Sequence, residues 1–325
     1  MEETFARLVS GARWRVAAEA WTTERLAERG IDVTGPIEQP RVRPWSTQLV
    51  VPTTAGRVWF KGNCRALAFE PGVHAQLAKL DPAEVDDPLA VDPERGWILT
   101  SDRGVTLADS HEATLADWRA LLALAARLQR RVAERGAALL GAGLPDCAPH
   151  TVPARYDAMT ARLAALPAEH PSHLTDGVRA ELEAGRRTVE EAVAALRASP
   201  LPTTLQHGDL HPGNVFAVEG SLRIFDFGDS QWAHALEILA VPYGWITRLT
   251  ELPWAEALDA YAGVWADLLE RETLEGLLSS AMVTHAVNRS FTWADAIADA
   301  SVEEAAEWAD APLHYLRLAL EPFAP

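Results

Sequence analysis

The feature of this chain that most constrains its fold is a pair of polar motifs separated by a short hairpin-like segment. The motifs read QHGDLHPGN at residues 206–214 and IFDFGD at residues 224–229. Between them, residues 215–218 and 221–225 are strand-like runs, and Glu219–Gly220 is a two-residue turn of the kind that closes a β-hairpin. The sequence therefore predicts a hairpin whose open end carries both motifs.

Pairing outward from the turn predicts which residues meet at the open end of the hairpin. Asn214 falls opposite Phe225 and Gly213 falls opposite Asp226, so Asn214 and Asp226 should converge. An amide oxygen and a carboxylate together suit a hard, oxygen-loving cation such as Mg²⁺. Asp209 comes just before them, on a loop, where its carboxylate can reach a substrate hydroxyl.

These residues resemble two elements of a known enzyme family. His207–Gly208–Asp209, with Asn214 five residues after the aspartate, resembles the catalytic loop of the aminoglycoside phosphotransferases, which share the protein-kinase-like fold with choline kinases and other small-molecule kinases. Asp226–Phe227–Gly228 resembles the metal-binding element of the same fold. The alternative interpretation is an ordinary surface turn followed by a strand.

The resemblance implies a fold class and a set of roles. The fold would be α+β and two-lobed, protein-kinase-like, with a small β-rich N-terminal lobe and a larger helical C-terminal lobe. Asp209 would orient the acceptor hydroxyl and accept its proton, while Asn214 and Asp226 would bind Mg²⁺ beside the phosphates of ATP or GTP. A turn-forming role is the alternative for Asp209, and His207 is expected to brace the loop by hydrogen bonding.

The N-terminal third reads as helices followed by strands. Helical patterns occupy residues 4–30, and strand-like runs follow at residues 36–43, 46–51 and 58–61. The third run ends in Lys61, one of only two lysines in the chain. The resemblance implies that Lys61 holds the α- and β-phosphates of the nucleotide, and the alternative is an ordinary surface lysine.

Three further residues are candidate nucleotide contacts. The fold needs an acidic partner for Lys61 on the next helix, and Glu70 is the candidate. Pro71 follows it and fits only the first turn of a helix, so Glu70 could instead be an N-terminal cap. The loop between the first two strands lacks glycine, which argues against a flexible backbone cradle for phosphate. Arg43 and Ser46 are the alternative phosphate contacts.

A strand-like run at residues 97–101 resembles the hinge between the two lobes, where backbone groups usually hydrogen-bond the adenine. Thr100 and Asp102 are the nucleotide contacts expected there. This places the nucleotide-binding lobe, with its leading helices, at residues 1–103. Residues 104–325 would form the helical lobe, with the catalytic loop, the metal site and the acceptor pocket.

The helical lobe is where the resemblance places the acceptor substrate. Candidate contacts are His211, Asp229, Trp293 and Asp295, because aromatic faces and carboxylates would suit a polyhydroxylated, aminated ligand. Asp229 could instead assist the metal, pair with a cation or cap a helix that begins at Ser230. Helical patterns occupy residues 113–136, 152–166, 175–198, 233–249, 254–271, 273–291 and 301–320.

The composition excludes some classes of function. A formal net charge of −17 argues against a nucleic-acid or anionic-membrane partner, is compatible with cationic substrates, and by itself favours solubility. Cys64 and Cys147 belong to no cysteine–histidine cluster, which argues against a zinc site or a disulfide framework. The acidic start of the sequence and the lack of a long apolar run predict a cytoplasmic protein.

The sequence thus predicts an ATP- or GTP-dependent, Mg²⁺-dependent O-phosphotransferase. Its acceptor would be a hydroxyl of a small cationic or sugar-like molecule, either an aminoglycoside-type antibiotic or a metabolic alcohol such as an amino sugar. The alternative is a non-catalytic, kinase-like nucleotide-binding module. A protein kinase is disfavoured by Gly208, which stands where those enzymes carry an arginine, and by the short segment after Asp226.

Overall fold

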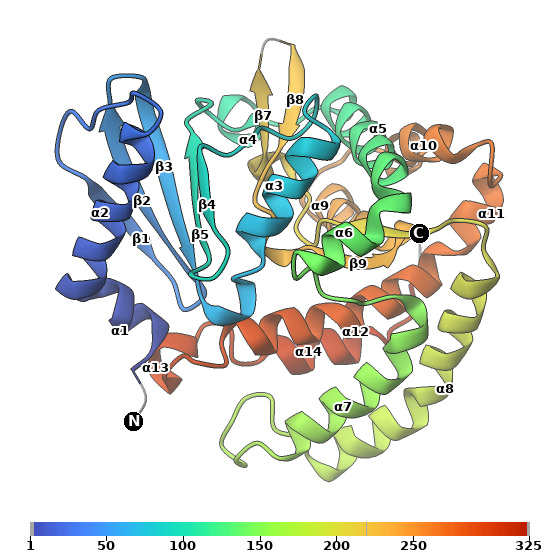
Figure 1. The fold of residues 1–325 in the computed structure, drawn as a ribbon. Coiled ribbons are helices and arrows are strands. Elements are labelled where there is room, and N and C mark those ends of the chain that lie inside the picture. The colour runs from blue at the N-terminus through green and yellow to red at the C-terminus, as the bar shows by residue number, and fades with distance from the viewer. Residues whose placement is uncertain (1–2, 219, 324–325) are drawn as a thin grey trace.

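The N-terminal part of the molecule is a five-stranded antiparallel sheet (Figure 1). The computed structural model describes residues 3–218 and 220–323. Strands β2 and β3 pair in register along their whole length, which sets Lys61 opposite Gln48. The strands lie in the order β1-β2-β3-β5-β4, with bounds β1 Glu38–Val42, β2 Ser46–Thr53, β3 Gly56–Asn63, β4 Ala90–Asp92 and β5 Trp97–Ser101.

Two helices at the N-terminus, α1 (Phe5–Ser10) and α2 (Ala12–Ala27), pack beside this sheet (Figure 1). Trp14 and Trp21 of α2 both meet the ring of Phe60 edge-on, with ring centroids 5.9 Å apart in each pair. Edge-to-face contacts of this kind add to the burial of apolar surface. They fix the central strand β3, and with it the position of Lys61.

Helix α3 (Glu70–Leu80) links the sheet to the helical part of the molecule. It begins at Glu70, with Pro71 in its first turn, where a proline costs no hydrogen bond. Val73 and Leu77 on its buried face belong to the large apolar core of the helical part. Glu70 is therefore held at the start of a helix that is anchored on both sides.

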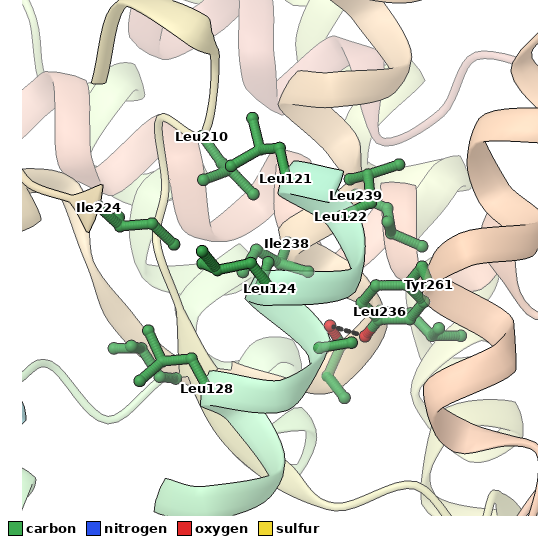
Figure 2. Close-up of a cluster of buried hydrophobic side chains, with 14 of the residues drawn as sticks. Leu121, Leu122, Leu124, Leu128, Leu210, Ile224, Leu236, Ile238, Leu239 and Tyr261 are labelled. Atoms are coloured by element: carbon green, nitrogen blue, oxygen red, sulfur yellow. Dashed lines mark hydrogen bonds between the residues drawn. The ribbon is translucent and has the colours of Figure 1, made fainter. Parts of the chain in front are cut away.

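The helical part is built around α5 (Leu115–Val132), whose first turn is closed by a capping box between Thr114 and Asp117. Leucines of α5 pack in one cluster with Leu210, Ile224, Leu236, Ile238 and Leu239, so the core directly supports both sequence motifs (Figure 2). Further helices are α4 Leu107–Ser110, α6 Gly136–Gly141, α7 Val152–Ala164, α8 Asp176–Ala198, α9 Ala240–Leu249, α10 Trp254–Trp265, α11 Arg271–Gly276, α12 Leu278–Ala296, α13 Val302–Ala305 and α14 Ala311–Leu318.

The hairpin between the two motifs has the predicted register. β7 (Val215–Val218) pairs with β8 (Ser221–Ile224), Val215 opposite Ile224. The N–H of Phe225 donates to the carbonyl of Asn214 over 3.1 Å, which extends the pairing to the open end. Of the predicted turn, Glu219 lies outside the described residues, and Gly220 has a positive φ of 80°.

The structure contains a second pair of strands that the sequence did not predict. One of them precedes the first motif, and the other follows the second motif. β6 (Thr203–Gln206) ends where the first motif begins, and β9 (Gln231–His234) follows the second. The expected helix over residues 233–249 is wrong in its first part, because residues 231–234 are all buried and pair with β6. The helix that follows, α9, begins only at Ala240.

Three other predicted helices differ in their limits. The pattern at residues 254–271 ends as a helix at Trp265, and residues 273–291 are divided between α11 and α12. The pattern at residues 301–320 is broken into α13 and α14, because Pro312 belongs in the first turn of α14. Within residues 3–218 and 220–323, no helix has both the length and the apolarity that a membrane crossing requires.

Candidate active site

The two motifs pack directly against each other through Gly208. This glycine has a φ of +86°, and a Cβ atom built on it would lie 2.0 Å from the backbone oxygen of Asp229. Real side chains never come so close, and the positive φ disfavours any other residue. Gly208 therefore lets the Asp209 loop lie against the segment that contains Asp226, which brings two of the predicted site residues into one region.

His207 braces the loop, as its hydrogen bonds show. The N–H of Asp209 donates to Nδ1 of His207 over 3.3 Å, which leaves Nε2–H to donate to the carbonyl of Phe225 over 3.0 Å. Burial lowers the pKa of His207 and keeps the ring neutral. The ring of Phe227 lies between those of His207 and His74, with centroids 5.3 and 5.4 Å away.

Asp209 is held by two neighbours. The side-chain amide of Asn214 donates to its carbonyl oxygen over 2.8 Å and to Oδ2 over 3.2 Å, and Nε2 of His211 lies 3.4 Å from Oδ2. Burial alone would raise the pKa of Asp209, but the hydrogen bond from His211 and the positive charge of Arg289 outweigh it, so that the pKa lies below its ordinary value. Asp209 is therefore a carboxylate at neutral pH, with a fixed orientation.

Lys61 joins the sheet to the second motif. Its Nζ lies 2.7 Å from Oε2 of Glu70 and 2.7 Å from Oδ1 of Asp226, while Asn63 donates to Oε2 of Glu70 over 2.9 Å. Burial would lower the pKa of Lys61, but the two carboxylates raise it above its ordinary value. Glu70 thus forms an ion pair with Lys61 and also begins helix α3.

Asp226 occupies an unusual backbone conformation. Its φ is 64°, the only positive value of a non-glycine residue among those described. Such a conformation costs of order 1–3 kcal/mol and persists where the surroundings impose it. Partial burial would raise the pKa of Asp226, but Lys61 brings it down to about 2 through its charge and hydrogen bond. The left-handed turn directs this carboxylate towards the lysine.

A cleft of about 270 Å³, here called the Lys61 cleft, lies between the sheet and the hairpin. Its lining includes Lys61, Glu70, Asp226, Thr100 and Phe225. The cleft therefore combines an ionic end, formed by the lysine and its two carboxylates, with a wall supplied by β5.

A second cavity, here called the Trp245 pocket, has a volume of about 390 Å³. Asp209 lines it, together with residues of α9, α12, α14 and the segment that follows α14. The ring of His211 stacks on that of Trp245, with centroids 4.8 Å apart and planes 13° apart. Asp209 thus faces the Trp245 pocket while its neighbour Asn214 stands at the base of the hairpin that carries Asp226.

Comparison with known proteins places the chain in a family. The profile described as "Phosphotransferase enzyme family" matches residues 61–276, which is more than half of the sequence and includes both motifs. The chain belongs to this family. None of the curated protein sequences is similar enough to count as a relative.

Solved structures agree on the fold of this phosphotransferase. The macrolide 2'-phosphotransferase of Brachybacterium faecium is 18% identical, with a TM-score of 0.58 over 94% of this chain and 99% of that one. The Plasmodium vivax ethanolamine kinase is 10% identical, with a TM-score of 0.62 over 89% and 83%. A spectinomycin phosphotransferase, solved with ADP and spectinomycin, is 12% identical, with a TM-score of 0.54 over 92% and 97%. The two-lobed, protein-kinase-like fold expected from the sequence is confirmed.

Three residues predicted as nucleotide contacts do not line the Lys61 cleft of this phosphotransferase. Ser46 is buried, and Arg43 places its guanidinium over the ring of Trp308, 5.5 Å from its centroid. Asp102 pairs with Arg57 and accepts a hydrogen bond from the N–H of Gly104 over 2.9 Å. These side chains do not line the Lys61 cleft, whereas Thr100 does.

Of the four residues predicted to contact the acceptor, His211 and Asp229 contact residues that line the Trp245 pocket. The other two do not line it. His211 contacts Asp209, and Asp229 forms an ion pair with Arg289 over 3.0 Å. No helix begins at Ser230, which is followed by β9, so the capping alternative for Asp229 is wrong. Trp293 packs edge-on against Trp45, and Asp295 pairs with Arg162; neither lines the Trp245 pocket.

Sequence reasoning missed Arg289 and did not single out Trp245. Arg289 lies within α12, where its side chain is only 8% exposed, and it lines the Trp245 pocket. A signal was present, because Asn288–Arg289–Ser290 is a polar triplet inside a largely apolar helix. A charge buried in that way requires a partner, but the sequence does not say that the partner is Asp229.

Proposed function

We propose that the protein transfers the γ-phosphoryl group of Mg²⁺-bound ATP, or GTP, to a hydroxyl of a small molecule held in the Trp245 pocket. The observation that supports this most is the position of Asp209, which faces the Trp245 pocket and is joined through Asn214 to the hairpin that carries Asp226. A transferase of this kind needs a carboxylate at the acceptor and a metal ligand at the nucleotide within one site.

The nucleotide would occupy the Lys61 cleft. Its base would lie against β5 near Thr100, and its phosphates would lie at the ionic end. Lys61, held by Glu70, would bind the α- and β-phosphates as a compact point charge. Because Lys61 contacts both carboxylates, Glu70 would still hold the lysine if Asp226 served as a metal ligand.

The residues present fit a magnesium ion that also binds phosphate. No group of three or more His, Cys, Asp or Glu side chains within residues 3–218 and 220–323 could hold a metal by itself. Asn214 and Asp226 offer two oxygen ligands, and Mg²⁺ in kinase sites takes its other ligands from phosphates and water. When bound, the ion would neutralise charge on the β- and γ-phosphates.

Asp209 would align the acceptor and take its proton. The acceptor oxygen forms a bond to the γ-phosphorus, the bond from that phosphorus to the β-γ bridging oxygen breaks, and the nucleoside diphosphate leaves. The hydroxyl proton passes to Asp209. Because the pKa of Asp209 is below its ordinary value, its main task is to orient the hydroxyl, with proton transfer late in the reaction.

A sugar-like alcohol remains the proposed acceptor, since the pocket combines aromatic rings with polar groups that suit hydroxyls. A cytoplasmic location is proposed on the ground that the nucleotide substrates are abundant there. The alternative, a non-catalytic nucleotide-binding module, has less support because Lys61, Asp209, Asn214 and Asp226 are all present and positioned near one another.

The test is Mg²⁺- and ATP-dependent release of ADP across a panel of hydroxylated small molecules, with Asp209→Asn as the blank. Turnover that is lost in the variant while it still binds the nucleotide supports the transferase. Nucleotide binding without turnover on any acceptor favours the binding module, and a variant that turns over normally contradicts the role of Asp209.

A further inference from the structure

We propose that the acceptor in the Trp245 pocket is an amphiphilic alcohol, neutral or anionic, with a large apolar face, and that polycationic sugars are excluded. This inference rests on the proposed function and names the class of its acceptor. It departs from the cationic acceptor that the sequence suggests, because the side chains that line the pocket differ from the acidic residues that the sequence singles out.

One part of the pocket wall is aromatic and aliphatic. Trp245 and Leu249 project from α9, Met282 comes from α12, and Tyr315 and Phe323 come from α14 and the segment after it. His211 fixes the ring of Trp245 by stacking on it. Flat, apolar walls of this kind recognise an extended apolar face by burying it.

The charges that line the pocket are mixed. Among the described residues, Asp209 and Glu321 are the carboxylates that line it, and Arg248 and Arg289 are the guanidinium groups. Arg289 is already paired with Asp229 over 3.0 Å, so the described lining offers a ligand two carboxylates and the guanidinium of Arg248, in a protein whose formal charge is −17. Burial lowers the pKa of His285, which also lines the pocket, to about 3, so that it adds no charge at neutral pH.

Three acidic side chains of the helical part are paired with arginines and do not line the pocket. Asp295 pairs with Arg162, and Asp267 pairs with Arg130. Asp259 likewise pairs with Arg271. Among the described residues, a polycation in the Trp245 pocket would therefore meet two carboxylates, Glu321 and Asp209, and Asp209 is needed for the hydroxyl.

The two arginines differ in what they offer a ligand. Arg289 is buried, with its charge matched by Asp229 at 3.0 Å and its guanidinium over the ring of Trp293. Arg248 is exposed at the wall of the pocket, and no ion pair joins it to another described residue. Arg248 is thus available to an anionic or hydrogen-bond-accepting group, and it repels an ammonium group at the same place.

The inference can be tested by binding, independently of turnover. The probe is 8-anilinonaphthalene-1-sulfonate, an anionic dye with an apolar body, titrated into the full-length protein and followed by its fluorescence. The variants are Trp245→Ala and Arg248→Glu. The control is Arg197→Glu, which makes the same change of charge on an exposed residue of α8 outside the pocket.

We expect the dye to bind, and both Trp245→Ala and Arg248→Glu to weaken it at least fivefold, while Arg197→Glu leaves the dissociation constant unchanged. A tetra-aminated aminoglycoside should not displace the dye. Failure of the dye to bind, equal binding by Trp245→Ala, or tight binding of the aminoglycoside would each overturn the inference. ADP release with Asp209→Asn as the blank is scored separately, so a failed transferase proposal is distinguishable from a wrong acceptor class.

Discussion

The Lys61 cleft and the Trp245 pocket meet at the paired motifs, but they are built from different kinds of contact. The ionic end of the cleft is a network of charged groups in which Lys61 is shared by Glu70 and Asp226, each 2.7 Å away. The pocket is formed by side chains from helices distant in the sequence, and its described lining mixes carboxylates with guanidinium groups. Under the proposed function, nucleotide binding would thus depend on a few charged residues, whereas acceptor choice would depend on how helices pack.

Each region also has a buried glutamate, and the two glutamates have different kinds of partner. Glu70 in the cleft has the ammonium of Lys61 as its partner. Glu237, behind the pocket, accepts hydrogen bonds from Thr284 over 2.8 Å and Asn288 over 3.0 Å, and burial raises its pKa to about 7. Burial raises the pKa of Glu70 as well, but the charge of Lys61 opposes that rise, whereas Glu237 has hydrogen-bond donors as its partners.

We expect the largest effect from Gly208→Ala. This glycine lies against the backbone of Asp229, and both the cleft and the pocket depend on that contact. A Cβ atom would lie 2.0 Å from the backbone oxygen of Asp229, at a positive φ. We expect a loss of about 4 kcal/mol or more in the free energy of unfolding, measured by urea denaturation. The control is Gly263→Ala, where the added Cβ meets no atom within 4 Å in helix α10; it should be neutral or slightly stabilising. Equal stability of the two variants would contradict the packing described.

Asp209→Asn should separate chemistry from nucleotide binding. The amide keeps the shape of the side chain but cannot accept the hydroxyl proton, so kcat should fall about 10³-fold. Steady-state ADP release with the best acceptor measures this effect. If kcat changed by less than about tenfold, Asp209 would not be the group that activates the acceptor.

Trp245→Ala should act on one region only. Removal of the ring that stacks on His211 takes away part of the apolar wall, so the KM of the acceptor should rise about tenfold. The KM of ATP should stay constant, because Trp245 lines the pocket and not the cleft. A parallel rise of both values would mean that the two regions are not independent.

A further effect concerns the dependence of stability on pH. A carboxyl group whose pKa is raised in the folded state, as that of Glu237 is, makes the protein less stable as the pH rises from its unfolded value of 4.5 towards about 7. The full change amounts to about 3 kcal/mol. Glu237→Gln cannot ionise, so its melting temperature should fall less between pH 5 and pH 8 than that of the wild type. Identical pH profiles would show that Glu237 is not neutral when buried.

Residues at the ionic end of the Lys61 cleft were easier to predict from the sequence than residues of the Trp245 pocket. The sequence was sufficient to anticipate the hairpin register and the position of Lys61, because both follow from local pairing rules and from motifs with fixed spacing. It could not assign Arg43, whose guanidinium lies on Trp308 at the far end of the chain. It also did not indicate β9, which is a strand only because Thr203–Gln206 lies beside it.

The residues of the Trp245 pocket, the proposed acceptor site, were harder to predict for a physical reason. Trp293 and Asp295 share α12 with Arg289, but only Arg289 lines the pocket, and Asp295 is used by Arg162 instead. Helical periodicity identifies a buried face, but it does not identify which helix that face will meet. Side chains that gather from α9, α12 and α14 carry no common motif that would reveal their proximity.

The central claim is that Asp226 serves the nucleotide and Asp209 serves the acceptor, and calorimetric titration of Mg²⁺-ATP into Asp209→Asn and Asp226→Asn tests it most directly. We predict wild-type affinity for Asp209→Asn and at least tenfold weaker, less Mg²⁺-dependent binding for Asp226→Asn, because Asp226 contacts Lys61 and lines the cleft and Asp209 does neither. Unchanged binding by Asp226→Asn, or equal losses in both variants, would contradict it.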